Sequence, residues 1–210
     1  MAASPSIAVA APAARDALVR RARGLAWLGM AWHAIEAAVA LVAGIAAGSI
    51  ALVGFGADSV VEAVAGLVLL WRFGARRSAS EHAERRAQQL IGVSFYVLAA
   101  YVAVQAVRSL VVGDQPDAST AGIVLAVATL VTMPPLARAK ARLADELHSS
   151  ATRAEGRQNM ICAYLAGALL VGLSANAALD WWWADPATAL VIAAVAVREG
   201  RDAWRGHACC

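Results

Sequence analysis

The sequence predicts an all-α fold, a bundle of six transmembrane helices, from three observations. Hydrophobic residues make up 60% of the chain, whereas a soluble domain is about 45–50% apolar. Long apolar runs recur along the chain, and about 20 consecutive apolar residues are enough for a helix to cross a bilayer. The charged residues, 16% of the total, collect between these runs. A membrane domain therefore accounts for the composition.

We expect each apolar run to form a spanning helix, because a helix closes its backbone hydrogen bonds internally and can lie in lipid. The last run is short for a bilayer, and Arg198 is expected to extend it as a snorkelling side chain. Pro134 and Pro135 are expected to close the fourth run, since proline ends or kinks a helix. The six spans cover about residues 24–44, 49–71, 90–112, 120–136, 160–179 and 184–197.

The domain organisation follows from these spans. Residues 1–23 are rich in Ala and Pro, and we expect a disordered cytoplasmic tail there. A secretory signal carries its charges before a short apolar core, whereas here arginines precede a full span, so the first helix is expected to stay uncleaved. The transmembrane domain then covers residues 24–198, and residues 199–210 form a second short tail. Neither tail is long enough to fold as a domain of its own.

The distribution of charge predicts the orientation of the bundle. The tails and the connections at about 72–89 and 137–159 are rich in Arg, whereas the other three connections contain neither Lys nor Arg, and two of them contain Asp. Because positively charged loops stay in the cytoplasm, both termini are expected there. The net charge of +3 then marks topology, and no nucleic-acid partner is expected. We expect an integral, lipid-embedded protein of the bacterial plasma membrane.

Cysteine usage adds little to this assignment. Cys162 lies in an apolar run and Cys209 and Cys210 end the chain, which is not a disulfide framework. The terminal His207, Cys209 and Cys210 are either a frayed end of the chain or a place of transient metal capture. Both interpretations stay open.

Two acids, Asp58 and Glu62, lie inside the second apolar run. At a spacing of i,i+4 they share one face of a helix, with Cβ atoms about 5–6 Å apart. A carboxylate costs about 2.5–3.5 kcal/mol at the bilayer centre, so the pair needs protons, a cation or a partner such as Arg108. Acids inside a membrane are functional by default. We predict a cation site in which metal and protons compete for the same oxygens.

Two further helices offer polar groups for this site. Gln158 and Cys162 share a face of the fifth span, and with the acid pair they would make a mixed carboxylate, amide and thiolate site that suits Zn²⁺. Taken alone, a cysteine in an apolar helix is usually a small buried hydrophobe, and a glutamine at a helix start is usually an interfacial residue. His33 and Glu36 share a face of the first span, either as a polar pair within the bundle or as a support that relays protons.

The second span carries a motif typical of one transporter family. The stretch GSIALVGFGADSVVEAVAG resembles the second transmembrane helix of cation diffusion facilitators, where an acidic DxxxD binds the transported metal. Asp58 matches the first acid and Glu62 the second, with Glu in place of Asp. The run WWWADPATALVIAAVAVREG resembles the family's sixth helix, and AEGRQNMICAYLAGALL resembles its fifth. There Gln158 and Cys162 stand in the places of the family's HxxxD.

The resemblance covers nearly all of residues 24–205. It points to a short, transmembrane-only branch that lacks the usual cytoplasmic C-terminal domain. It implies a homodimer that works by alternating access and moves a divalent metal out of the cytoplasm in exchange for H⁺.

The sequence therefore predicts a transporter of a divalent cation, foremost Zn²⁺, driven by proton antiport. No resident cofactor is expected, because the metal is cargo. The predicted ligands are Asp58, Glu62, Cys162 and Gln158, with Glu36 and His33 in support. A membrane-embedded metal-binding or accessory protein without turnover is the alternative, and the missing HxxxD favours it. An enzyme is not expected, since we find neither a nucleophile–base pair nor a hydrolytic metal motif.

Overall fold

The computed structural model describes residues 12–74 and 81–205, and this part of the chain forms six helices without a strand. The predicted all-α fold is confirmed. Within the described residues, α1 to α5 are long and apolar enough to cross a membrane. The helices are α1 (Pro12–Ala47), α2 (Ile50–Gly74), α3 (Glu81–Val112), α4 (Thr120–Leu147), α5 (Ser150–Leu179) and α6 (Ala184–Trp204).

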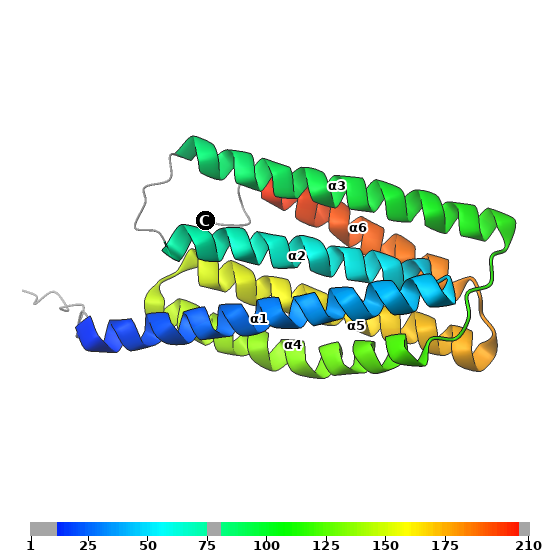
Figure 1. Ribbon diagram of the computed structural model, residues 1–210, viewed down its shortest axis with the longest axis horizontal. Coiled ribbons are helices and arrows are strands. Elements are labelled where there is room, and N and C mark those ends of the chain that lie inside the picture. The colour runs from blue at the N-terminus through cyan, green and yellow to red at the C-terminus, as the bar shows by residue number, and fades with distance from the viewer. Residues whose placement is uncertain (1–11, 75–80, 206–210) are drawn as a thin grey trace, which may run out of the picture.

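Successive helices run in opposite directions along the bundle (Figure 1). The connections from α1 to α2, from α3 to α4 and from α5 to α6 lie at one end. The α4–α5 turn lies at the other end, where α1 begins and α6 ends. We call this second end the N-terminal end of the bundle. Its charge pattern predicts that it faces the cytoplasm.

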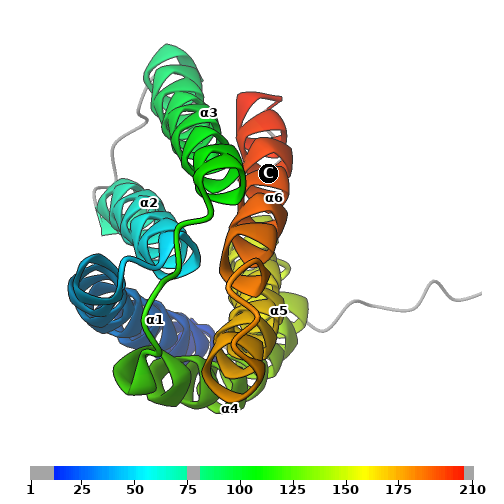
Figure 2. The ribbon, with the colours of Figure 1, turned by 90° about the vertical axis from the view of Figure 1, so that its right-hand side faces the viewer.

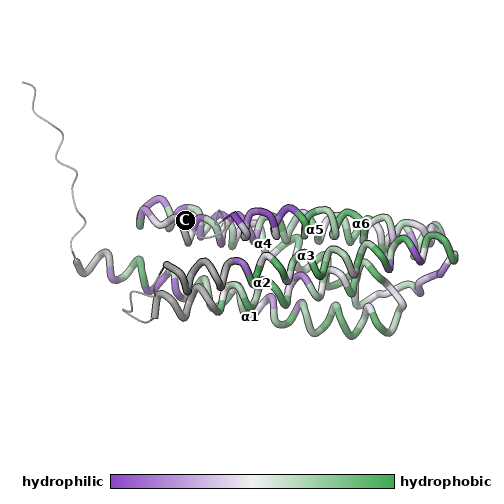
Figure 3. The backbone as a smooth tube through the Cα atoms, turned by 90° about the horizontal axis from the view of Figure 1, so that it is seen from above, coloured by the Kyte–Doolittle hydropathy of each residue, from purple (hydrophilic) through white to green (hydrophobic). Residues whose placement is uncertain are grey.

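Three pairs of helices pack along their lengths: α1 with α2, α4 with α5, and α3 with α6. α1 also packs against α4, which closes a group of α1, α2, α4 and α5. α3 and α6 project from one side of this group (Figure 2). Hydrophilic residues gather toward the N-terminal end of the bundle, where α6 ends (Figure 3). The apolar spans and the charged helix ends are therefore separated along the bundle axis.

The helices extend beyond the apolar runs from which the spans were predicted. α1 begins at Pro12, so residues 12–23 are helical where a disordered tail was expected. The segment is rich in Ala, Leu and Arg, which are strong helix formers, and Pro12 is at the first helical position, where proline is tolerated. Residues 199–204 continue α6 in the same way. Residues 1–11, 75–80 and 206–210, including His207, Cys209 and Cys210, lie outside the described residues.

The prediction that Pro134 and Pro135 close the fourth span is wrong, because α4 continues through them to Leu147. Each proline removes only one backbone hydrogen bond. The buried face of α4 continues on both sides of the prolines and packs against α5, and such packing supplies most of the stability of a helix. The charged residues expected in a loop at 137–159 therefore lie on two helices. His148 and Ser149 alone make the turn.

Glycines allow α1 and α2 to approach each other closely. A Cβ atom on Gly44 would lie 2.8 Å from the backbone nitrogen of Val53, and one on Gly56 would lie 3.0 Å from the backbone nitrogen of Leu41. Gly48 makes the turn between the two helices with a φ of +66°, which glycine adopts without strain. The first two helices therefore form a tight hairpin.

The first turn of α6 caps the first turn of α2. The carboxylate of Asp185 accepts hydrogen bonds from the backbone N–H groups of Ile50 (2.9 Å) and Ala51 (3.3 Å) and from the hydroxyl of Ser49. Ser49 in turn accepts from the backbone N–H of Leu52 at 3.1 Å. Free N–H groups at a helix start favour a negative charge, so this carboxylate holds α2 and α6 in register.

Candidate metal centre

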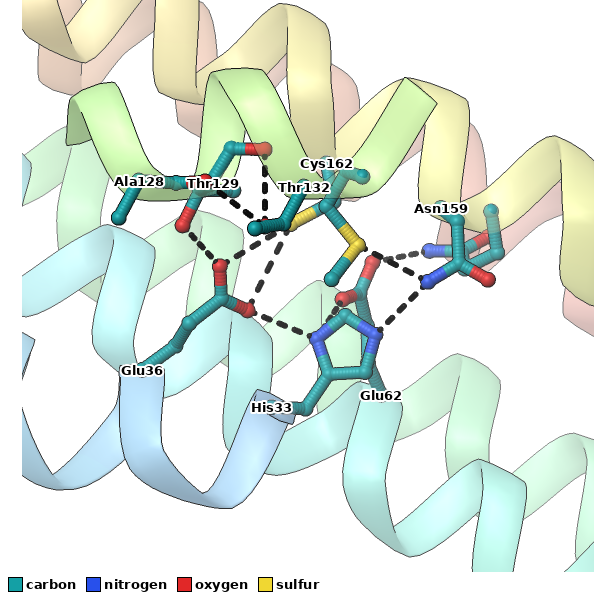
Figure 4. A network of polar contacts seen from close by, with 10 residues as sticks. His33, Glu36, Glu62, Ala128, Thr129, Thr132, Asn159 and Cys162 are labelled. Carbon is teal, nitrogen blue, oxygen red and sulfur yellow. Dashed lines mark hydrogen bonds and ion pairs between the residues drawn. The ribbon is translucent and has the colours of Figure 1, made fainter. Parts of the chain in front are cut away.

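Polar side chains from four helices meet inside the bundle (Figure 4). His33 and Glu36 come from one face of α1, as their i,i+3 spacing requires. Glu62 comes from α2, Thr129 from α4, and Cys162 from α5. All five residues are buried. The bundle therefore brings together groups that lie far apart in the sequence, at a depth where the surrounding helices are apolar.

The ligand atoms of His33, Glu62 and Cys162 all lie within 4.8 Å of one another. The imidazole Nδ1 of His33 is 3.0 Å from Oε2 of Glu62. This oxygen is buried, and it makes no well-directed hydrogen bond with any residue that the structure describes. A buried carboxylate oxygen without an aligned donor is energetically costly. A bound cation would satisfy it.

Glu36 is fully buried beside these three residues. Its Oε2 lies 3.0 Å from Nδ1 of His33, and the hydroxyl of Thr129 donates a hydrogen bond to its Oε1. The thiol of Cys162 lies 3.8 Å and 3.9 Å from the two oxygens. The carboxylate thus contacts two of the three candidate ligands and fixes their positions. The expected support from Glu36 has a structural basis, although its role in proton transfer stays a prediction.

Two amides on α5 border the centre. Nε2 of Gln158 donates a hydrogen bond of 2.5 Å to Oε1 of Glu62, so Gln158 orients Glu62. Nδ2 of Asn159 lies 3.4 Å from Nε2 of His33 and donates to the sulfur of Met133 at 3.1 Å. Oδ1 of Asn159 is a second buried acceptor without a partner among the described residues.

Asp58 lies one helical turn before Glu62 on α2 and is buried, with 3% of its surface exposed. It does not belong to the cluster of His33, Glu62 and Cys162. Within the described residues Asp58 makes no side-chain hydrogen bond or ion pair. Arg108, the alternative partner for the acid pair, is exposed on α3. Glu62 is instead held by His33 and Gln158.

The structure therefore changes the emphasis among the predicted residues. Glu62 and Cys162 lie together, Gln158 contacts Glu62, and Asp58 stands one turn away. His33, expected only in support, is a direct candidate ligand. Sequence reasoning missed Thr129, because a threonine in an apolar helix carries no distinguishing signal. The i,i+3 spacing of His33 and Glu36 was the signal that α1 faces the site.

This set of donors defines the chemistry that the centre can perform. Imidazole nitrogen, carboxylate oxygen and thiolate sulfur together suit Zn²⁺ and other borderline-soft ions better than Mg²⁺ or Ca²⁺. In a tetrahedral zinc site with bonds of about 2.0–2.3 Å, neighbouring ligand atoms lie about 3.3–3.8 Å apart. The distances between the ligand atoms of His33, Glu62 and Cys162, which extend up to 4.8 Å, would have to shorten by about 1 Å to reach that geometry.

Comparison with protein families identifies the kind of protein that carries this centre. The model of the cation efflux transmembrane domain matches residues 26–205. The chain belongs to the cation efflux family. A search of the curated proteins finds no match. As a cation efflux protein, the chain is a membrane-embedded cation transporter by family, which agrees with the spanning helices α1 to α5. The match includes His33, Glu62 and Cys162, so the centre lies within the family's transmembrane domain.

Proposed function

We propose that this cation efflux protein moves a divalent metal ion, foremost Zn²⁺, out of the cytoplasm in exchange for protons. The observation that carries the proposal is the buried cluster of His33, Glu62 and Cys162, whose ligand atoms come from three helices and lie within 4.8 Å of one another. Because one cation would be bound by α1, α2 and α5 together, its binding or release would change how these helices are held against one another. A homodimer is part of the proposal, on the ground of family resemblance.

Zinc is favoured because the three donors differ in softness. A thiolate selects against Mg²⁺ and Ca²⁺, and imidazole and carboxylate complete a tetrahedral site with room for a fourth ligand. Asp58, one turn away on α2, would supply that ligand after a small rotation or shift of the helix. Oδ1 of Asn159, a buried oxygen without a described partner, is the other candidate.

Proton exchange follows from the chemistry of the ligands. Cys162 binds a metal as thiolate, and His33 binds it through a neutral nitrogen, so metal binding releases protons. Glu36 contacts both residues and is placed to accept them. The buried carboxyl groups of Asp58 and Glu62 and the thiol of Cys162 carry protons when no cation is present, because an unpaired buried charge is costly. After releasing the metal, the protein would therefore return to the state that is open to the cytoplasm with protons bound in place of the metal.

The test is Zn²⁺ flux into proteoliposomes with and without a pH gradient, comparing the unchanged protein with Glu62→Gln and Asp58→Asn. We expect a flux that requires the gradient and is lost in both variants. Glu146→Gln is the matched control, since Glu146 is an exposed acid at the end of α4. Its flux should equal that of the unchanged protein.

A metal-binding or accessory protein without turnover remains the second candidate. The observation that favours it is the pair Gln158 and Cys162 in place of the family's HxxxD. Stoichiometric Zn²⁺ binding without gradient-dependent flux would establish it, and the transport proposal would then be wrong.

A further inference from the structure

A lysine is buried next to the metal centre. Lys140 lies on α4 with 4% of its surface exposed, and its Nζ is 3.1 Å from Oε2 of Glu155 on α5. The site of Lys140 was predicted to be a loop, yet the side chain is enclosed by α1, α4 and α5. Gly29 of α1 makes the room, because a Cβ atom there would lie 2.9 Å from the ammonium nitrogen.

The ion pair stands between the metal centre and the N-terminal end of the bundle. Gly29 precedes His33 by one turn on α1, and Glu155 precedes Cys162 by about two turns on α5, a rise of about 10 Å. The Gly29 position that lies 2.9 Å from Nζ of Lys140 also lies 3.8 Å from Nδ2 of Asn159. That amide is 3.4 Å from Nε2 of His33. The Lys140 ammonium and the His33 imidazole therefore both lie close to the side-chain amide of Asn159.

The Lys140 side chain is 5% exposed and that of Glu155 is 19% exposed, and the attraction between their opposite charges holds the pair together. Separating the partners leaves a charge without compensation inside the protein, which costs several kcal/mol. Another cation that approaches Glu155 removes most of that penalty for the carboxylate, since it replaces the ammonium. The lysine side chain is long and flexible and reaches water at the nearby helix end when it is released. The pair therefore opens most easily for a cation.

We propose that the Lys140–Glu155 ion pair is the gate of the metal path on the side of the α1 N-terminus. An incoming divalent cation displaces the Lys140 ammonium from the Glu155 carboxylate, and then passes to His33, Glu62 and Cys162. This gate rests on the proposed function for its cargo. Its closing of the path is a property of the empty protein, so it is measured without metal.

The experiment uses Cys162 as a reporter. In a Cys209→Ser/Cys210→Ser background, Cys162 is the sole remaining cysteine of the chain. Its rate of modification is measured with a small cationic methanethiosulfonate in membrane vesicles, applied from either face. We expect Lys140→Ala and Glu155→Ala each to raise the rate at least about tenfold from the face of the α1 N-terminus, an effect of ~1.4 kcal/mol. The charge exchange Lys140→Glu/Glu155→Lys should restore protection.

The chain offers a matched control for the gate variants. Arg153 and Asp145 also join α5 to α4, but their side chains are 61% and 64% exposed. Arg153→Ala should leave the modification of Cys162 unchanged. An equal rise from both faces in Lys140→Ala would mean a loosened fold, and no rise would mean no barrier. Either result would overturn the gate.

Flux and modification separate the two proposals. Faster modification of Cys162 from the one face, in a protein that carries no Zn²⁺ flux, would leave the gate standing and reject transport. Unchanged modification together with gradient-dependent flux would reject the gate alone.

Discussion

The imidazole of His33 and the carboxylate of Glu62 meet across two helices, with Nδ1 and Oε2 3.0 Å apart. Their contact joins α1 to α2 inside the bundle, on the side that faces Cys162 of α5. It places a candidate nitrogen ligand on the first helix, where family resemblance alone assigns none. The first prediction concerns this residue.

His33→Ala should weaken Zn²⁺ binding about 100-fold, or ~2.7 kcal/mol, because it removes the nitrogen donor. The measurement is isothermal titration of Zn²⁺ into the purified protein in detergent. His148→Asn is the control, since His148 is exposed in the left-handed turn after α4 and asparagine adopts that conformation. Equal affinities of His33→Ala and the unchanged protein would remove His33 from the site.

Cys162→Ser should change which metal binds best. Loss of the thiolate removes the soft donor, so the affinity for Cd²⁺ should fall more than the affinity for Mn²⁺. With Co²⁺ as the probe, the unchanged protein should show a thiolate-to-metal absorption band that the variant lacks. Cys209→Ser/Cys210→Ser should keep the band. A band that survives in Cys162→Ser would assign it to the tail.

Zinc affinity should fall as the pH is lowered between about pH 8 and 6, because the ligands must lose protons to bind metal. Each proton released on binding adds about one logarithmic unit of affinity per pH unit. Titration at several pH values gives the slope, and release into a weakly buffered solution gives the proton count directly. A pH-independent affinity would contradict exchange of metal for protons at this site.

Asp185→Asn should lower the free energy of unfolding by about 1–3 kcal/mol, since the charged cap of α2 becomes a neutral amide. Thermal unfolding of the detergent-solubilised protein measures this. Asp180→Asn serves as control, because Asp180 is exposed and sits in a left-handed conformation that asparagine tolerates. Zinc affinity should change little in Asp185→Asn, as Asp185 caps the first turn of α2, about three turns before Glu62.

Gly44→Ala should destabilise the α1–α2 hairpin by about 1–3 kcal/mol, because the added methyl group meets the Val53 backbone at 2.8 Å. Gly24→Ala is the matched control on the same helix. A Cβ atom at Gly24 meets nothing within 4 Å, so that change should be neutral or stabilise the helix by up to about 1 kcal/mol. Equal melting temperatures of the two variants would contradict the close approach of the helices.

The fold was predictable because a bilayer demands long apolar helices, and the runs that satisfy it are visible in the sequence. The helix ends were not, since Ala-, Leu- and Arg-rich segments outside the apolar runs also form helix. Pro134 and Pro135 misled for a related reason: packing against α5 outweighs two missing backbone hydrogen bonds. Helix propensity is a property of one segment alone, whereas packing against neighbouring helices determines where that helix ends.

The site was predictable in part for the same kind of reason. Spacing of i,i+4 reveals which residues share a face of one helix, and it identified Glu62 and Cys162. It does not reveal which helices touch, so the place of His33 beside Glu62 and the separate place of Asp58 required the bundle. Lys140 and Glu155 carried no signal at all, because a charged pair after an apolar run is typical of a loop.

The two tight turns of the bundle lie at opposite ends. Gly48 and Ser49 tie α1 to α2 at one end, whereas His148 and Ser149 tie α4 to α5 at the other. The metal centre lies between these two hairpins, taking His33 and Glu62 from the first and Cys162 from the second. Each hairpin is therefore closed by its turn at one end of the bundle, and at that end the two helices of the other hairpin are not joined by a turn. Under the proposed function, a metal ion bound by these three residues would link the two hairpins, and its release would leave them free to separate.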